Sequence, residues 1–177
     1  MIEGCKAVKD LKDIISSIFN KPDSEIIEYE ITVCHSNNKF IAGDIRRGEA
    51  GYVRPSLKKC PEGSKRVGTI HTHPFRAYKL SENDIINSAL FGDKFICIAI
   101  PEDRKTLCVD VDKLKPDVRE KLRRIAKLEG KRVAEAIKKS LGNHYEPYEH
   151  LEKEIEKIAK EILGNINKNL KVCNVEI

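Results

Sequence analysis

Residues 68–84, GTIHTHPFRAYKLSEND, decide how the rest of the chain is interpreted. The residues that lead into the two histidines, 67–70, are mostly β-branched and apolar, which predicts a buried strand that ends at His71 and His73. Side chains two positions apart point to the same face of a strand, so both imidazoles can reach one metal ion. Pro74 cannot donate to a sheet ladder, which suits an exit from the strand at that point.

A helix start follows the second histidine after seven residues. Ser81 has the side chain of an N-cap, and Asp84 lies one turn into the predicted helix 81–90. Ser81 and Asp84 are also a common capping box, which by itself indicates nothing about function. Two neutral imidazoles and one carboxylate, however, leave one position of a tetrahedral zinc ion open, as a hydrolytic zinc site requires.

The pattern His-x-His-x7-Ser-x-x-Asp resembles that of the JAMM (JAB/MPN) metalloprotease family, and all four positions match. The resemblance covers residues 6–111 and implies that His71, His73 and Asp84 bind Zn²⁺. It also implies that Ser81 is catalytic and stabilises the oxyanion of the tetrahedral intermediate. The fold that it implies is α+β, a JAB/MPN-like mixed β-sheet flanked by helices in a layer like that of cytidine deaminases.

The family uses a glutamate on an early strand as general base. We expect Glu30 to take this role, because it lies 41 residues before His71 in the centre of the predicted strand 25–34. Glu28 is the second choice, since it has the same facing as Glu30 by the period of two. Glu49 stands in GEAGYV, which is locally more like the family motif, but it lies only 22 residues before His71. The family string Glu-x-x-Gly is absent from the first predicted strand, so the choice among the three stays open.

The resemblance implies a substrate class as well. Catalytic members cleave the peptide or isopeptide bond after the Gly-Gly tail of a ubiquitin-like modifier or a sulfur-carrier protein. One alternative is a non-catalytic scaffold of the same fold, although such relatives usually lack metal ligands that this chain retains. The other is a metal-dependent hydrolase of another class, such as a nuclease; the Pro-Cys-x-x-Cys signature of a deaminase is absent.

The remaining elements follow from periodicity and turn residues. Strands are predicted at 25–34, 39–46, 94–101 and 106–111, with a weaker extended segment at 48–57, and helices at 6–20, 116–141 and 148–163. This order predicts an α+β layer with a mixed sheet. We expect a metalloprotease-like domain at 1–112 and, at 113–177, a C-terminal helical hairpin that packs on it or forms a partner surface.

Charge and histidine placement point to few further sites. Residues 113–139 hold eleven Lys and Arg against four Asp and Glu. A groove for nucleic acid would need such charge, but the mixed signs and the lack of interleaved aromatic residues favour a solvated helix face. Nucleic acid is therefore not an expected partner, whereas an oligomer is allowed. His35 is predicted in a turn, and His144 and His150 receive no role.

The six cysteines are scattered along the chain without a CxxC pair, and we expect thiols in a reducing compartment. There is no apolar run of 18 residues, and the first ten residues are too polar for a signal peptide. The sequence therefore predicts a soluble, cytoplasmic protein without a membrane partner.

Overall fold

The computed structural model describes residues 2–48, 60–142 and 149–177. The chain divides into two compact units. The first contains Met1–Lys79, Asp93–Lys113 and Asn169–Ile177, and the second contains Leu80–Gly92 and Leu114–Lys168. Both units are discontinuous in sequence, so they do not test a boundary between residues 112 and 113, and that boundary stays a prediction.

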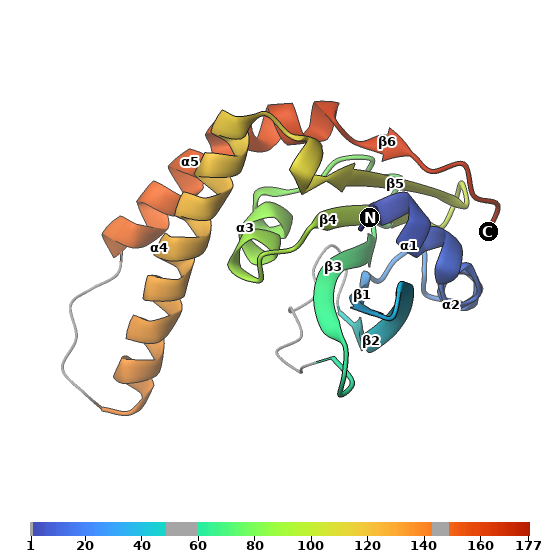
Figure 1. The fold of residues 1–177 in the computed structure, drawn as a ribbon, viewed down its shortest axis with the longest axis horizontal. Coiled ribbons are helices and arrows are strands. Elements are labelled where there is room, and N and C mark those ends of the chain that lie inside the picture. The colour runs from blue at the N-terminus through green and yellow to red at the C-terminus, as the bar shows by residue number, and fades with distance from the viewer. Residues whose placement is uncertain (1, 49–59, 143–148) are drawn as a thin grey trace. The chain divides into compact units, whose positions relative to one another are not determined.

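The first unit is a six-stranded mixed sheet with two short helices (Figure 1). Its elements are α1 Gly4–Asp10, α2 Lys12–Phe19, β1 Tyr29–Ser36, β2 Lys39–Arg47, β3 Lys65–Thr72, β4 Phe95–Ile100, β5 Lys105–Asp110, the 3₁₀ turn Val111–Lys113 and β6 Lys171–Val172. The strand order is β2-β1-β3-β4-β5-β6, with β3 and β4 parallel and all other neighbours antiparallel. The predicted α+β class with a mixed sheet flanked by helices is thereby confirmed.

Helices α1 and α2 cover one face of this sheet. Their buried apolar side chains belong to the same core cluster as buried residues of β1, β3 and β4; the cluster includes Ala7, Val8, Leu11, Ile15, Ile18, Ile31, Val33, Ile70 and Phe95. Strand β4 is buried along its whole length, as its continuous apolar run FICIAI predicts. Strand β3 lies between β1 and β4 and is buried from Val67 to Thr72, so its end is held on both sides.

Two predicted elements of this unit have wrong bounds. The helix at 6–20 is two helices, because the backbone at Leu11 (φ −102°, ψ 14°) leaves the helical region, and both halves bury apolar residues in one core. The strand at 25–34 begins only at Tyr29, since the amides of Ile26 and Ile27 bond to the carbonyl of Asp23 in a helical turn. Strand β6 was not predicted. Most of the extended segment at 48–57, including Glu49, lies outside the described residues.

The second unit is helical, with α3 Glu82–Leu90, α4 Pro116–Ser140 and α5 Glu149–Lys168. Helices α4 and α5 lie side by side (Figure 1), as the predicted hairpin requires. The predicted end of α5 at residue 163 is wrong, because the helix continues through Gly164 to bury Ile166. Basic side chains of α4 pair with acidic ones of α5: Lys121 with Glu161 at 3.2 Å, and Arg124 with Glu154. This pairing agrees with a solvated helix face.

The cysteines correct another expectation. All six lie within the described residues and form three disulfides, Cys5–Cys173, Cys34–Cys60 and Cys97–Cys108, so the prediction of thiols is wrong for this structure. The partners are 168, 26 and 11 residues apart in sequence and are brought together by the tertiary fold, which the spacing of the cysteines does not indicate. Among the helices of the described residues, none has the length and apolar character needed to cross a membrane.

Candidate metal centre

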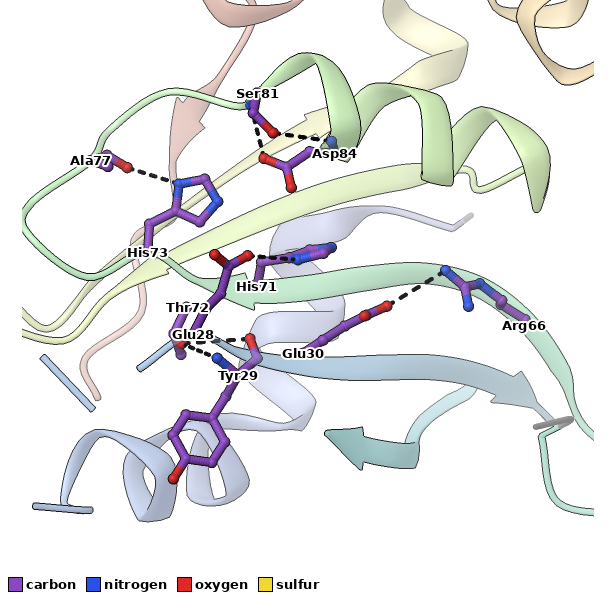
Figure 2. A network of polar contacts seen from close by, with 10 residues as sticks. All are labelled: Glu28, Tyr29, Glu30, Arg66, His71, Thr72, His73, Ala77, Ser81 and Asp84. Carbon is purple, nitrogen blue, oxygen red and sulfur yellow. Dashed lines mark hydrogen bonds and ion pairs between the residues drawn. The ribbon is translucent and has the colours of Figure 1, made fainter. Parts of the chain in front are cut away.

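The two histidines of the motif lie at the end of β3. His71 is opposite Glu30 of β1 and Ile98 of β4, and the amide of His73, just beyond the strand, donates to the carbonyl of Ala99 at 2.9 Å. The two ring centroids are 6.5 Å apart with the planes at 79°. Both imidazoles are buried and lie on the same side of the strand (Figure 2), as the period of two predicts.

A hydrogen bond determines the tautomer of His73. Its Nδ1 lies 3.0 Å from the carbonyl oxygen of Ala77 in the loop that follows the strand. A carbonyl only accepts, so Nδ1 carries the proton and donates. Nε2 then has the lone pair, which is the state that a metal ligand needs, and the carbonyl contact holds the ring in place.

Glu28 lies beside both imidazoles. Its Oε1 is 3.4 Å from Nδ1 of His71 (Figure 2), and a carboxylate oxygen of Glu28 lies within 4.8 Å of a ring nitrogen of His73. Glu28 is 6% exposed, so water screens this contact little. The first unit therefore gathers two imidazoles and one carboxylate at the end of β3.

Glu30 has different neighbours, although it is only two residues away. Its Oε1 lies 4.0 Å from Nη2 of Arg66, and Arg66 itself makes two hydrogen bonds to Asp93 at 2.9 and 3.1 Å. Burial raises the pKa of Glu30 above its ordinary value, against the opposing charges of His71 and Arg66. Glu30 therefore lies nearer to the Arg66–Asp93 pair than Glu28 does, and it is 1% exposed.

Thr72 holds the backbone next to Glu28. Sequence reasoning did not indicate this role. The side chain of Thr72 points away from the two histidines between which it stands, and its Oγ1 accepts a 2.7 Å hydrogen bond from the amide of Tyr29. The carbonyl of Glu28 accepts a further 2.8 Å bond from the amide of Gly48. Both bonds engage the peptide group between Glu28 and Tyr29, so the chain is fixed directly after Glu28, where β1 begins. The β-branched polar residue inside the His-x-His string was the available signal.

The loop after His73 is anchored to the turn between β4 and β5. The amide of Arg76 donates to Glu102 at 3.0 Å, its Nε donates to Asp103 at 3.2 Å, and the hydroxyl of Tyr78 also donates to Asp103. The last contact raises the pKa of Tyr78 to about 12 and lowers that of Asp103. Phe75 in the same loop is 67% exposed. The side chains of Arg76 and Tyr78 in this loop are therefore held in place, whereas that of Phe75 is not buried.

Ser81 and Asp84 belong to the second unit, where they form the predicted capping box of α3 (Figure 2). The Oγ of Ser81 accepts from the amide of Asp84 at 3.2 Å, and Oδ2 of Asp84 accepts from the amide of Ser81 at 2.8 Å. The residue before the cap is fixed too, because Asn167 of α5 exchanges two hydrogen bonds with the backbone of Leu80. The assembly of Asp84 with His71 and His73 stays a prediction of the sequence pattern.

The other candidate residues join no such group. His35 lies in β1 with its ring 4.9 Å from that of Phe40, and His150 is an exposed residue of α5. His144 and Glu49 lie outside the described residues. No family model, curated protein or solved structure matches this chain.

Proposed function

We propose that this chain is a zinc-dependent peptidase or isopeptidase of the JAMM (JAB/MPN) type. It would cleave the bond after the Gly-Gly tail of a ubiquitin-like or sulfur-carrier protein, in the cytoplasm. The observation that carries the proposal is the pair of buried imidazoles on one side of the end of β3, with the Glu28 carboxylate beside them. The motif of the sequence adds Asp84 as the third ligand and Ser81 as the oxyanion donor.

The donor set fits zinc. His73 offers Nε2 because its Nδ1 is engaged by Ala77, and two imidazoles with one carboxylate are a usual catalytic zinc set. Bound zinc would lower the pKa of a coordinated water towards neutrality. Both rings are buried, so bulk water would screen their interaction with a bound ion little.

The general base is a carboxylate that takes the proton of the attacking water and passes it to the leaving amine. The contacts of Glu28 with His71 and His73 support Glu28 for this role, in place of the Glu30 that the chain spacing favours. Glu30 remains the competing assignment, with its carboxylate next to Arg66. Ser81 accepts with its oxygen from the Asp84 amide, so its own proton can be donated to an oxyanion.

The proposal requires Asp84 to join the two histidines, and the short covalent link supports this. Tyr78 is tied to Asp103 by its hydroxyl, and only Lys79 and Leu80 separate it from Ser81. Tyr78 and Ser81 are three Cα–Cα steps apart, so their Cα atoms lie within about 11 Å of each other. The capping box then places the Asp84 carboxylate at the first turn of α3, beside Ser81.

The deciding experiment is zinc content of protein purified with its disulfides intact. We expect about one zinc per chain in the wild type and its loss in His73→Ala and Asp84→Asn. The asparagine keeps a side-chain acceptor for the capping box while removing the carboxylate charge. Asn83→Ala, an exposed position in the same helical turn, is the matched control and should keep its zinc. Zinc retained by both ligand variants would contradict the proposed centre.

Cleavage of a Gly-Gly-linked fusion of a ubiquitin-like protein then tests the activity. A non-catalytic scaffold is the second candidate, and one observation favours it. The capping box accounts for the side chains of Ser81 and Asp84 through local hydrogen bonds, without any metal. A wild type that binds zinc but leaves every Gly-Gly fusion intact would favour the scaffold.

A further inference from the structure

Four of the six cysteines gather at one place in the first unit. The disulfides Cys5–Cys173 and Cys97–Cys108 lie against each other, with the sulfurs of Cys173 and Cys108 3.5 Å apart. The sulfurs of Cys5, Cys108 and Cys173 are all within 4.8 Å of one another. Cys97, Cys108 and Cys173 are buried, whereas Cys5 is half-buried.

Backbone contacts hold these four residues independently of the disulfides. Cys97 and Cys108 are directly opposite each other on β4 and β5, with Cα atoms 4.1 Å apart. The amide of Cys173 donates to the carbonyl of Thr106 at 2.8 Å, next to the pairing of β6 with β5. Next to Cys5, the fourth cysteine, the amide of Gly4 donates to the side chain of Asp110 at 2.8 Å and holds the start of α1. Opening both disulfides would therefore leave four thiols at one place.

We propose that these four thiols, once reduced, form a tetrathiolate site for one zinc ion. In tetrahedral zinc sites the Zn–S distance is about 2.3 Å, which sets neighbouring sulfurs about 3.8 Å apart. The sulfur of Cys108 lies 3.5 Å from that of Cys173 and within 4.8 Å of that of Cys5, close to this value. The bonded pairs must open, and the Cys97 thiol must turn to join the other three, by rotation about the Cα–Cβ bonds.

A cavity gives the ion a way in. It has a volume of about 310 Å³ and is lined by Cys5, Cys108 and Cys173 together with Glu3, Asp110 and Lys113. Lys113 contacts Glu3 at 3.5 Å and Asp110 at 3.4 Å, so this wall carries both signs of charge. The cluster thus has buried sulfur ligands on one side and a polar opening on the other.

The chemistry balances with a named reductant. A dithiol gives each disulfide two electrons and two protons and becomes a disulfide itself. A phosphine gives the two electrons and becomes a phosphine oxide, with the oxygen and the two protons taken from water. Binding of Zn²⁺ then releases the four thiol protons and leaves a complex with a net charge of −2. A reducing compartment, as expected for this chain, would supply the thiol form.

The test uses the whole chain, reduced with a phosphine, freed of metal by a chelator and titrated with Co²⁺ alone. We expect one cobalt to give the intense thiolate-to-metal charge-transfer absorption of a cobalt thiolate. The absorption should persist in His71→Ala/His73→Ala, which removes only the imidazoles of the proposed peptidase centre. It should also persist in Cys34→Ser/Cys60→Ser, the matched control that removes the third disulfide pair. Its absence in the reduced wild type would overturn the proposal, whatever the fate of the peptidase assignment.

A second measurement needs no variant and so does not depend on a variant's folding. Reduced wild type is treated with iodoacetamide with and without two equivalents of zinc, enough for both proposed sites, and each cysteine is followed by mass spectrometry. Zinc should slow alkylation of Cys5, Cys97, Cys108 and Cys173 at least tenfold while Cys34 and Cys60 react at unchanged rates. Equal protection of all six, or of none, would count against a site made of these four.

Discussion

At the residue scale, Glu28 lies just before β1 and Glu30 lies within it, and the two carboxylates make different contacts. Glu28 contacts His71, and Glu30 is nearer to Arg66. We expect Glu28→Gln to lower kcat/KM on a Gly-Gly fusion by about 10²–10⁴-fold, the usual contribution of a general base, without loss of zinc. Glu30→Gln is the matched variant and should cost less activity. The reverse order, with zinc bound in both, would assign the base to Glu30.

The pKa of Tyr78 reports on the loop that follows β3. Its hydrogen bond to Asp103 raises its pKa to about 12 from the ordinary 10.0. Because the pKa is raised on folding, this contact stabilises the protein fully below pH 10 and is lost as the pH rises through 12. Asp103→Asn should move the pKa of Tyr78 back towards 10.0.

The measurement is the absorbance of tyrosinate as a function of pH, with Tyr78→Phe to assign the transition. If the highest tyrosine pKa is the same in wild type and Asp103→Asn, the hydrogen bond to Asp103 is not its cause. Phe75 and Arg76 in the same loop have positive φ values of 62° and 52°, which the anchoring contacts must hold in place.

At the scale of elements, the close approach of β3 and β4 depends on Gly68. A Cβ at this position would lie 2.5 Å from the ring of Phe95 and 2.7 Å from its carbonyl oxygen, and the backbone atom cannot move aside. We expect Gly68→Ala to lower the free energy of unfolding by about 1–3 kcal/mol. It should also lower zinc occupancy, because β3 carries both histidines.

Gly164 in α5 is the matched control. A Cβ there meets nothing within 4 Å, and its helix continues on both sides. Gly164→Ala should raise the free energy of unfolding by about 0.4–1 kcal/mol, because alanine has the higher helix propensity and restricts the unfolded chain. Urea unfolding followed by circular dichroism measures both variants. Equal effects of the two substitutions would mean that the clearance at Gly68 does not matter.

Comparing the predicted with the observed elements shows which features local sequence patterns could predict and which depend on tertiary contacts. His-x-His at a strand end and the capping box at Ser81 are local patterns, and both appear where the pattern places them. The break at Leu11 and the late start of β1 depend on packing and on turn hydrogen bonds to Asp23, which periodicity does not contain. The β1–β3 register places Glu30 opposite His71, yet the 3.4 Å side-chain contact to His71 Nδ1 comes from Glu28, just before β1, and alternation alone could not separate the two glutamates.

At the scale of the whole molecule, the disulfides differ in how much chain they close. Cys5–Cys173 spans 168 residues and Cys97–Cys108 spans 11. The chain-entropy model gives about 5 kcal/mol for the longer loop and about 3 kcal/mol for the shorter one. Cys5→Ala/Cys173→Ala should therefore destabilise the oxidised protein more than Cys97→Ala/Cys108→Ala. Guanidinium unfolding of both pairs under oxidising conditions checks this, and an inverted order would contradict it.

The pairing of the cysteines could not be predicted from the sequence for a physical reason. The short β6 brings Cys173 to β5 through only two paired residues, and such a strand has no detectable pattern. Scattered cysteines in an expected reducing compartment then favour thiols. Helix α1 contacts β5 and β6 pairs with β5, and this shared neighbour brings Cys5 and Cys173 together.

The Cys5–Cys173 bond also changes the connectivity of the polypeptide. With that bond closed, residues 5–173 form a covalent ring, and the described ends project from it as short tails. A protease that cuts this ring once opens it without separating the pieces. A singly nicked chain should therefore run as one band on a denaturing gel without reductant and as two bands with it.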